Sequence, residues 1–329
     1  MTEAETDSRP PTLQVRPDVV QPDVAPTVTH TAAPSVLPDA PPAPRPGRGA
    51  RPRASFSVVI PAHDEERTIG RCLDFAAELE PGEAEIVVVA NGCTDETATV
   101  AASVPGVRVI LLDAAGKTDA LNAGDAVSAA YPRVYLDADI AVSADTLRRM
   151  RDALSAGTPR ICAPTIRFAT DGRPWSVRAF YRIYEQLPYV RCGLVGLGIY
   201  GISAEGRRRF DGFPRITADD LYVQRMFTAD ERTVLDDAEF VVQTPRTLRA
   251  LLRVRTRTAV GNAELAGVPG ASADFGRTGG GTTRALVGLV ARHPGLLPAG
   301  LVYAGVTAVS RMRARLRRNH QWHRDTSTR

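Results

Sequence analysis

Apolar runs and helix-like segments alternate along the chain from residue 55 to about residue 145. Four short runs are almost wholly apolar, and each ends at polar or turn-forming residues: 56–60, 85–90, 107–112 and 134–136. The segments between them carry apolar residues at helical spacing: 65–79, 94–104 and 117–131. Wholly apolar strands that alternate with helices predict a mostly parallel central sheet covered on both faces, hence an α/β fold.

The pattern is less regular after residue 145. Strands are expected at 161–168 and at the end of a glycine-punctuated stretch, 194–202, and helices at 175–190, 219–227 and 244–258. We therefore expect one α/β domain over residues 55–258.

The two ends of the chain differ from this domain. Residues 1–54 are rich in proline, alanine, threonine and aspartate and carry few large apolar residues. Such a segment cannot bury enough surface to offset its ordering entropy, so we expect a disordered tail. Residues 259–329 are expected to form a linker followed by apolar and basic helices.

The C-terminal segment fits two interpretations. Residues 284–309 are strongly apolar, but prolines interrupt them, and the uninterrupted part is shorter than the roughly 20 residues of a membrane-spanning helix. Five arginines follow directly: Arg311, Arg313, Arg315, Arg317 and Arg318. The segment is either a helix pair that packs on the domain with an exposed basic face, or a surface that binds the anionic inner face of a membrane.

Charge and cysteine content narrow the class of protein. The 329 residues include 41 Lys and Arg against 37 Asp and Glu, and a net charge of +4 is too small to indicate a nucleic-acid partner. The four cysteines are far apart without a C-x-x-C pair, so neither a zinc site nor a disulfide framework is expected. The N-terminus has no apolar signal segment, which favours a cytoplasmic protein.

Polar residues follow the predicted strands, where parallel sheets bind their ligands. Asp137 and Asp139 come directly after the fourth strand, and two carboxylates at this spacing suit a hard divalent cation; the same pair could instead cap the next helix. Lys117, the only lysine in the chain, stands beside Gly116 at a predicted helix start, where it suits a phosphate or a carboxylate. The spacing from glycine to lysine excludes a P-loop.

Four motifs together resemble the family 2 glycosyltransferases, which have the Rossmann-like GT-A fold. In chain order they are Val59-Ile60-Pro61-Ala62-His63-Asp64-Glu65-Glu66, Ala90-Asn91-Gly92-Cys93-Thr94-Asp95-Glu96-Thr97, Gly116-Lys117 with Ala120-Leu121-Asn122, and Asp137-Ala138-Asp139. The resemblance covers about residues 55–258 and is densest up to Asp139. It implies a GT-A domain with a mostly parallel sheet, followed here by a helical C-terminal segment.

The resemblance also implies roles for individual residues. Three residues would line the nucleotide pocket: Pro61, Ala62 and Glu65. Asn91 would lie near the base, where the family usually carries an acid; an amide both donates and accepts hydrogen bonds, so the identity of the base stays open. Asp139, with Asp137 beside it, would bridge a Mn²⁺ or Mg²⁺ to the donor diphosphate. Lys117 would add positive charge there or orient an acidic neighbour.

A later acidic pair, Asp219-Asp220, matches the place of the family's general base. We expect Asp220 to be the base and Asp219 to be its neighbour or an acceptor ligand, although the same pair could cap the following helix. Paired carboxylates push their pKa values apart, which helps one of them to act as a base. Inversion of the anomeric centre follows from the resemblance and from the lack of an evident second nucleophile.

The sequence thus predicts a glycosyltransferase of hexosyltransferase type that uses a nucleotide-sugar donor. Its acceptor would be a glycan or a lipid-linked sugar in the synthesis of cell-surface polysaccharide or glycolipid, with the protein at the inner face of the cell membrane. Two alternatives remain, a catalytically inactive sugar-nucleotide-binding module and a nucleotidyltransferase. The glycine-rich opening loop of the latter is replaced here by Pro61-Ala62-His63, and the G-x-G-x-x-G of a dehydrogenase is absent.

Overall fold

The structure is a computed structural model that describes residues 35–36, 54–155, 157–158, 160–191, 198–216, 218–265 and 278–316. Several expectations concern residues outside these ranges. These residues are 1–34 and 37–53 of the proline-rich tail, 194–197 of the glycine-punctuated stretch, the linker 266–277, and the basic end after residue 316.

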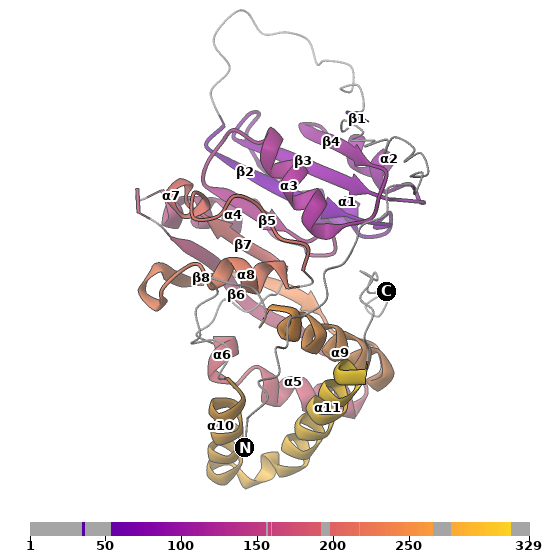
Figure 1. Cartoon of the computed structure of the whole chain (residues 1–329), viewed down its shortest axis with the longest axis vertical. Helices are drawn as coiled ribbons and strands as arrows, with labels where there is room; N and C mark the ends of the chain where they lie inside the picture. The colour runs from indigo at the N-terminus through magenta and orange to yellow at the C-terminus, as the bar shows by residue number, and fades with distance from the viewer. Residues whose placement is uncertain are drawn as a thin grey trace, which may run out of the picture. The chain divides into compact units, whose positions relative to one another are not determined.

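A single sheet organises the described residues (Figure 1). Its strands are β1 (Ser35–Val36), β2 (Phe56–Ala62), β3 (Ala84–Asn91), β4 (Val107–Leu112), β5 (Arg133–Leu136), β6 (Ile161–Ala169), β7 (Ile199–Ile202) and β8 (Arg232–Gln243). Their order across the sheet is β1-β4-β3-β2-β5-β7-β6-β8. Neighbours from β4 to β5 are parallel, as are β6 and β8, whereas β7 runs antiparallel between β5 and β6. The prediction of a mostly parallel sheet is confirmed.

Helices cover both faces of this sheet. In chain order the helices, some of which lie away from the sheet, are α1 (Ile69–Cys72), α2 (Thr97–Ala102), α3 (Lys117–Val127), α4 (Ala144–Leu154), α5 (Trp175–Tyr184), α6 (Pro188–Arg191), α7 (Ala204–Arg207), α8 (Asp219–Gln224), α9 (Leu248–Leu265), α10 (Thr278–Arg292) and α11 (Leu297–Leu316).

Alternate side chains of the central strands point to opposite faces, which is why these strands are apolar throughout. Val58 and Val88 pack in one cluster with residues of α1, α2 and α4. Val59 and Val89 point the other way, towards α3. At Gly124 of α3, a β-carbon would come within 2.5 Å of a Val59 methyl group, so the glycine lets this helix lie close against β2.

Two predicted helices end early for identifiable reasons. The helix expected to reach residue 131 ends at Val127, because the amides of Ala129 and Ala130 donate to the Glu85 carboxylate instead of to helix carbonyls. The helix expected at 175–190 is divided between α5 and α6, because Pro188 has no N–H to continue the hydrogen-bond pattern.

Two further segments differ in detail. The segment 65–79 forms only the four-residue α1 and then a 3₁₀ stretch, Leu73–Glu78. The helix expected from Thr244 begins at Leu248, since the Thr247 hydroxyl caps it by accepting from the Ala250 amide. This helix, α9, continues through residue 258, where we expected the domain to end.

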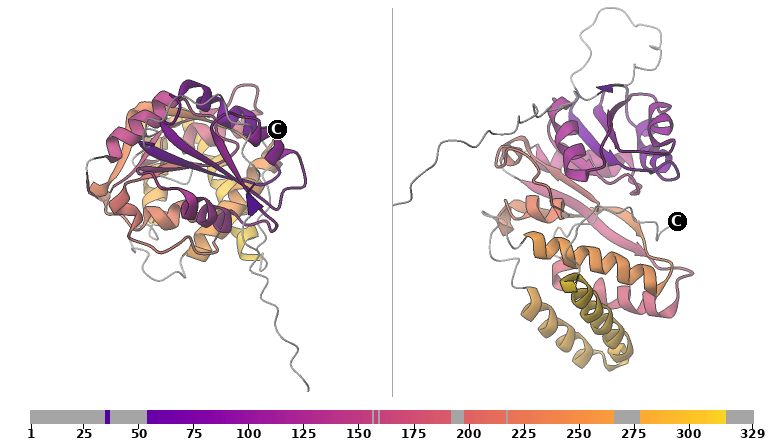
Figure 2. Two further views of the ribbon diagram at one scale, coloured as in Figure 1. Left: turned by 90° about the horizontal axis from the view of Figure 1, so that it is seen from above. Right: turned by 45° about the vertical axis from the view of Figure 1, so that its right-hand side comes forward.

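A second apolar cluster is built from α5, α9, α10 and α11 together with the ends of β6 and β8. Aromatic rings dominate it, and Phe180 stacks between Tyr184 and Tyr303 with ring centroids 5.6 and 5.2 Å away. Figures 1 and 2 show these helices gathered beyond the β6–β8 side of the sheet. Among the described residues, none of the helices is both long and apolar enough to cross a membrane.

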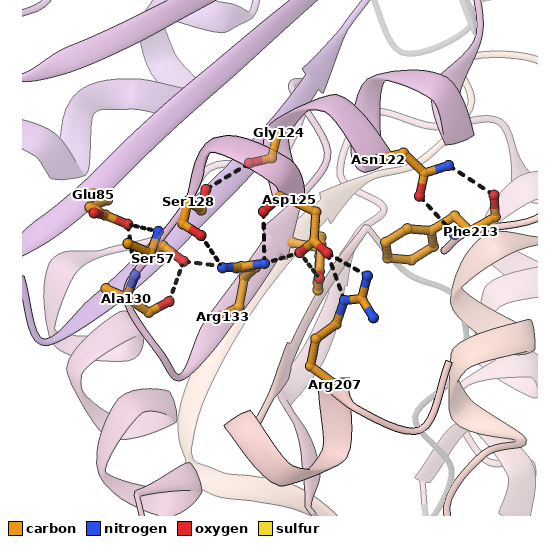
Figure 3. Close-up of polar contacts among 12 residues, drawn as sticks. Ser57, Glu85, Asn122, Gly124, Asp125, Ser128, Ala130, Arg133, Arg207 and Phe213 are labelled. Atoms are coloured by element: carbon orange, nitrogen blue, oxygen red, sulfur yellow. Dashed lines mark hydrogen bonds and ion pairs between the residues drawn. The ribbon is translucent and has the colours of Figure 1, made fainter. Parts of the chain in front are cut away.

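A buried ionic network joins α3 to its neighbours (Figure 3). The carboxylate of Asp125 accepts from Arg133 of β5, from the Tyr135 hydroxyl at 2.7 Å and from Arg207 of α7. Burial would raise the pKa of Asp125, but the hydrogen bond from Tyr135 and the two guanidinium groups hold it below its usual value. Arg133 is 1% exposed and also donates to the Ser57 hydroxyl.

Replacement of Asp125 by alanine is expected to lower the free energy of unfolding by about 3–5 kcal/mol, because it leaves the buried Arg133 charge uncompensated. Urea unfolding followed by circular dichroism measures this loss. Asp145→Ala is the matched control, since it removes an exposed carboxylate that pairs with Arg149 across one helical turn, and it should leave stability nearly unchanged. Equal losses in the two variants would contradict the assignment.

Candidate active site

Two acidic segments and one lysine meet at the carboxyl end of β5. The Lys117 ammonium, at the first residue of α3, lies 2.8 Å from Asp137 Oδ1 and 3.2 Å from Asp219 Oδ1. Asp137 follows β5 directly, and Asp219 is the first residue of α8. The structure therefore brings together three of the residues that the sequence singled out, from positions as far apart as 117 and 219.

The charges of this cluster shift one another. Burial would lower the pKa of Lys117, but the carboxylates of Asp137, Asp219 and Asp220 outweigh it and raise the pKa well above its usual value. Burial raises the pKa of Asp219 to about 7 against the opposing charge of Lys117. Burial likewise raises the pKa of Asp220. A carboxyl group with a raised pKa is a stronger base when ionised, which suits proton abstraction.

Asp219 is the more deeply buried member of the acidic pair. It is 1% exposed, and its Oδ2 atom accepts no hydrogen bond from the described part of the chain. Asp220 is half-buried, and its Oδ1 accepts from the Leu221 amide at 2.6 Å. Asp220 is therefore the member of the pair with more access to a bound molecule.

The backbone around Asp137 is tightly packed. The Asp137 amide donates to the Gly198 carbonyl at 2.7 Å, which joins the exit of β5 to the start of β7. Gly198 has a φ of 92°, and a β-carbon there would lie 2.8 Å from Ile140 and 3.3 Å from Asp137 Oδ2. Asp139 is half-buried two residues further on. Both carboxylates are oxygen donors of the kind that Mg²⁺ and Mn²⁺ prefer, so the residues fit a hard divalent cation.

The residues predicted to line the nucleotide pocket occupy the ends of β2 and β3. Pro61 and Ala62 are buried, and Glu65 is half-buried in the loop that follows. Asn91 is also fully buried: its amide donates to the Ala62 carbonyl at 2.7 Å and accepts from the Gly116 amide at 2.9 Å. In this structure Asn91 thus fixes the turn that carries Lys117.

Tyr200 of β7 is a site neighbour that the sequence did not indicate. Its hydroxyl is buried and has no hydrogen-bond partner among the described residues. Burial and then the nearby Asp219 carboxylate raise the pKa of Tyr200 well above its usual value. No sequence signal marks this residue, because its place depends on the insertion of an antiparallel strand between β5 and β6.

A parallel sheet with acidic residues at the exit of its central strand is the arrangement of a GT-A glycosyltransferase. The mannosyltransferase PcManGT from Pyrobaculum calidifontis, solved with GDP-Man and Mn²⁺, superposes with a TM-score of 0.57 at 20% identity. The superposition covers 80% of this chain and 86% of that one. It confirms the predicted fold.

Sequence comparison finds a matching family model and one similar protein. Residues 57–211 match the family model described as glycosyl transferase family 2. The succinoglycan biosynthesis protein ExoO of Rhizobium meliloti (strain 1021) is 33% identical over 128 residues. That match covers 38% of this chain and only 36% of the relative's length.

Proposed function

We propose that the protein transfers a sugar from a nucleotide diphosphate sugar to an acceptor hydroxyl, with inversion at the anomeric carbon. The observation that carries this proposal is the cluster in which Lys117 pairs with both Asp137 and Asp219, because one of these carboxylates is predicted to act on the donor and the other on the acceptor. The match of residues 57–211 to the family model supports the same reaction class.

In the proposed reaction Asp220 accepts the proton of the acceptor hydroxyl. The acceptor oxygen forms a bond to the anomeric carbon while the bond from that carbon to the diphosphate oxygen breaks. Asp219 and Lys117 hold Asp220 in place and balance its charge. The half-buried position of Asp220, against the deep burial of Asp219, supports this division of roles.

For the donor we propose Pro61, Ala62 and Glu65 beside the nucleoside, with Asn91 positioning the Gly116-Lys117 turn. Asp139 and Asp137 would hold a Mn²⁺ or Mg²⁺. Such a cation supplies positive charge to the leaving diphosphate. The pairing of Asp137 with the Lys117 ammonium supports this, since the Asp137 carboxylate already faces a positive charge.

We further propose an acceptor at the inner surface of the cell membrane, such as a lipid-linked glycan. Five of the eight exposed large apolar side chains in the described residues lie on α10 and α11: Val287, Leu297, Leu301, Met312 and Leu316. Residues 278–316 contain several arginines and neither Asp nor Glu, so this surface suits anionic lipids. Co-sedimentation with vesicles of anionic lipid tests this part, and equal binding to neutral vesicles would contradict it.

The purified chain should release nucleotide from one member of a panel of nucleotide sugars in the presence of Mn²⁺. Asp139→Ala should abolish release, since the proposed cation would lose its main ligand. Metal-dependent donor binding without release under any condition, with acceptor lipids included, would instead indicate an inactive binding module. Formation of a nucleotide sugar from a sugar phosphate would indicate a nucleotidyltransferase.

A further inference from the structure

A second group of metal-ligating side chains lies away from the acidic cluster. His63 and Asp64 follow β2, and Cys93 follows β3, which is the neighbouring parallel strand. One ligand atom from each of the three lies within 4.8 Å of the others. The sequence did not indicate this site, because Cys93 is separated from the other two residues by a strand and a helix.

Each of these side chains is oriented by a further hydrogen bond. His63 Nδ1 lies 2.7 Å from the Asn91 carbonyl, which can only accept, so Nδ1 is the donor and Nε2 is the nitrogen left to bind a metal in the neutral ring. His63 Nε2 is 3.9 Å from Asp64 Oδ2. An imidazole whose second nitrogen donates to a carbonyl is the usual arrangement of a metal-binding histidine.

Asp64 is held in an uncommon conformation. Its φ is 51°, and among the described residues it is the one non-glycine with a positive φ. The Thr94 amide donates to Asp64 Oδ1 at 2.7 Å and the Thr94 hydroxyl at 3.2 Å. These bonds fix one carboxylate oxygen on the β3 loop and turn Oδ2 towards His63. A residue keeps a strained backbone conformation only where the contacts around it enforce that conformation, and such residues are often found at functional sites.

We propose that His63, Asp64 and Cys93 form a binding site for Zn²⁺, distinct from the site for a hard cation at Asp137 and Asp139. Nitrogen, sulfur and oxygen donors together suit Zn²⁺, whereas Mg²⁺ and Mn²⁺ prefer oxygen alone. Three protein ligands leave a fourth tetrahedral position for water or another oxygen donor. Bonds of about 2.0–2.3 Å require the ligand atoms to approach one another by roughly 1 Å.

Binding of the metal must release a proton. The Cys93 Sγ lies 3.5 Å from the Ala62 carbonyl, as a thiol donor would, and burial raises the pKa of this group. The thiol proton therefore passes to solvent when sulfur binds the cation, and one sulfur–metal bond forms for each proton released.

Zinc at this position would connect the loop after β2 to the loop after β3. These loops adjoin Ala62, Glu65 and Asn91, so we expect bound Zn²⁺ to hinder entry of the donor nucleotide. This consequence rests on the proposed function, but the metal site itself does not. Zn²⁺ binding measured in the absence of any donor therefore tests the metal site alone, independently of the proposed function.

Titration of the full-length protein with Co²⁺ in excess Mg²⁺ tests the site, because Co²⁺ bound to thiolate absorbs in the near ultraviolet. The wild type should show this band, and Zn²⁺ should displace the Co²⁺. Cys93→Ser should lose the band, and both Cys93→Ser and His63→Gln should weaken Zn²⁺ binding by about 100-fold or more.

Two controls keep the result specific. Cys162→Ser removes a thiol buried in the core, and Asp139→Ala alters the proposed hard-cation site; both should retain the band. A wild type without the band, or a Cys93→Ser variant that keeps it, would overturn the proposal.

Discussion

Asp220→Asn is expected to lower kcat by about 10³-fold, within the range found for loss of a general base. An asparagine of nearly the same shape keeps the Leu221 amide contact but cannot take the proton of the acceptor hydroxyl. Because the role that we propose for Asp220 is on the acceptor and not on the donor, the affinity for the donor nucleotide should change by less than about threefold, or 0.7 kcal/mol.

Sugar transfer and donor binding must both be measured on the same variant protein. Transfer is followed as nucleotide release, and donor binding is followed by calorimetry. Asp236→Asn is the matched control, since Asp236 and Asp237 form another Asp-Asp pair, on the exposed part of β8, and this variant should keep full activity. An Asp220→Asn variant that retains more than about a tenth of wild-type kcat would exclude Asp220 as the base.

Lys117→Met is expected to change metal binding and transfer in opposite directions. Loss of the ammonium leaves Asp137, Asp219 and Asp220 with no opposing charge at the centre of the cluster, so Mn²⁺ should bind the donor-free protein several-fold more tightly. Transfer should nevertheless fall by about 10²-fold, because the carboxylates beside the base lose the group that positions them and one of them takes up a proton.

Electron paramagnetic resonance of free Mn²⁺ measures the first effect, and nucleotide release measures the second. Lys117→Arg retains the charge and should restore Mn²⁺ affinity to near the wild-type value, although its planar group does not reproduce the lysine contacts. If Lys117→Met bound Mn²⁺ more weakly, the lysine would be supporting the cation instead of competing with it.

Local sequence patterns predicted the part of the fold built on strands β2 to β5 well. The strands β2 to β5 are short apolar runs bounded by polar or turn-forming residues, and the order of a parallel sheet places their exits together. Lys117 and Asp137 could therefore be expected near each other. Their contact with Asp219 could not be derived from spacing alone, because it depends on how α8 packs more than eighty residues further along the chain.

Other features could not be predicted from the sequence, because they depend on contacts with residues from distant segments. β7 is four residues of ordinary strand sequence, and nothing in Ile199–Ile202 indicates that it lies antiparallel between β5 and β6. The end of α3 likewise depends on the Glu85 carboxylate, which comes from another strand. Asn91 lies in a segment that resembles a family motif, yet its burial and its bond to Gly116 require the β3–α3 packing to be known.

The contacts of α3 bear on any attempt to build chimeric enzymes. Among the described residues this helix meets the segment 204–220 at four points: Lys117 pairs with Asp219, Asp119 pairs with Arg215, Asn122 bonds the amide and carbonyl of Phe213, and Asp125 pairs with Arg207. Figure 3 shows the last two of these contacts. A graft that exchanges residues 204–220 alone would break these contacts. A chimera that exchanges α3 together with residues 204–220 would preserve these contacts. The two segments together are therefore the smallest unit that can be exchanged without breaking the contacts between them.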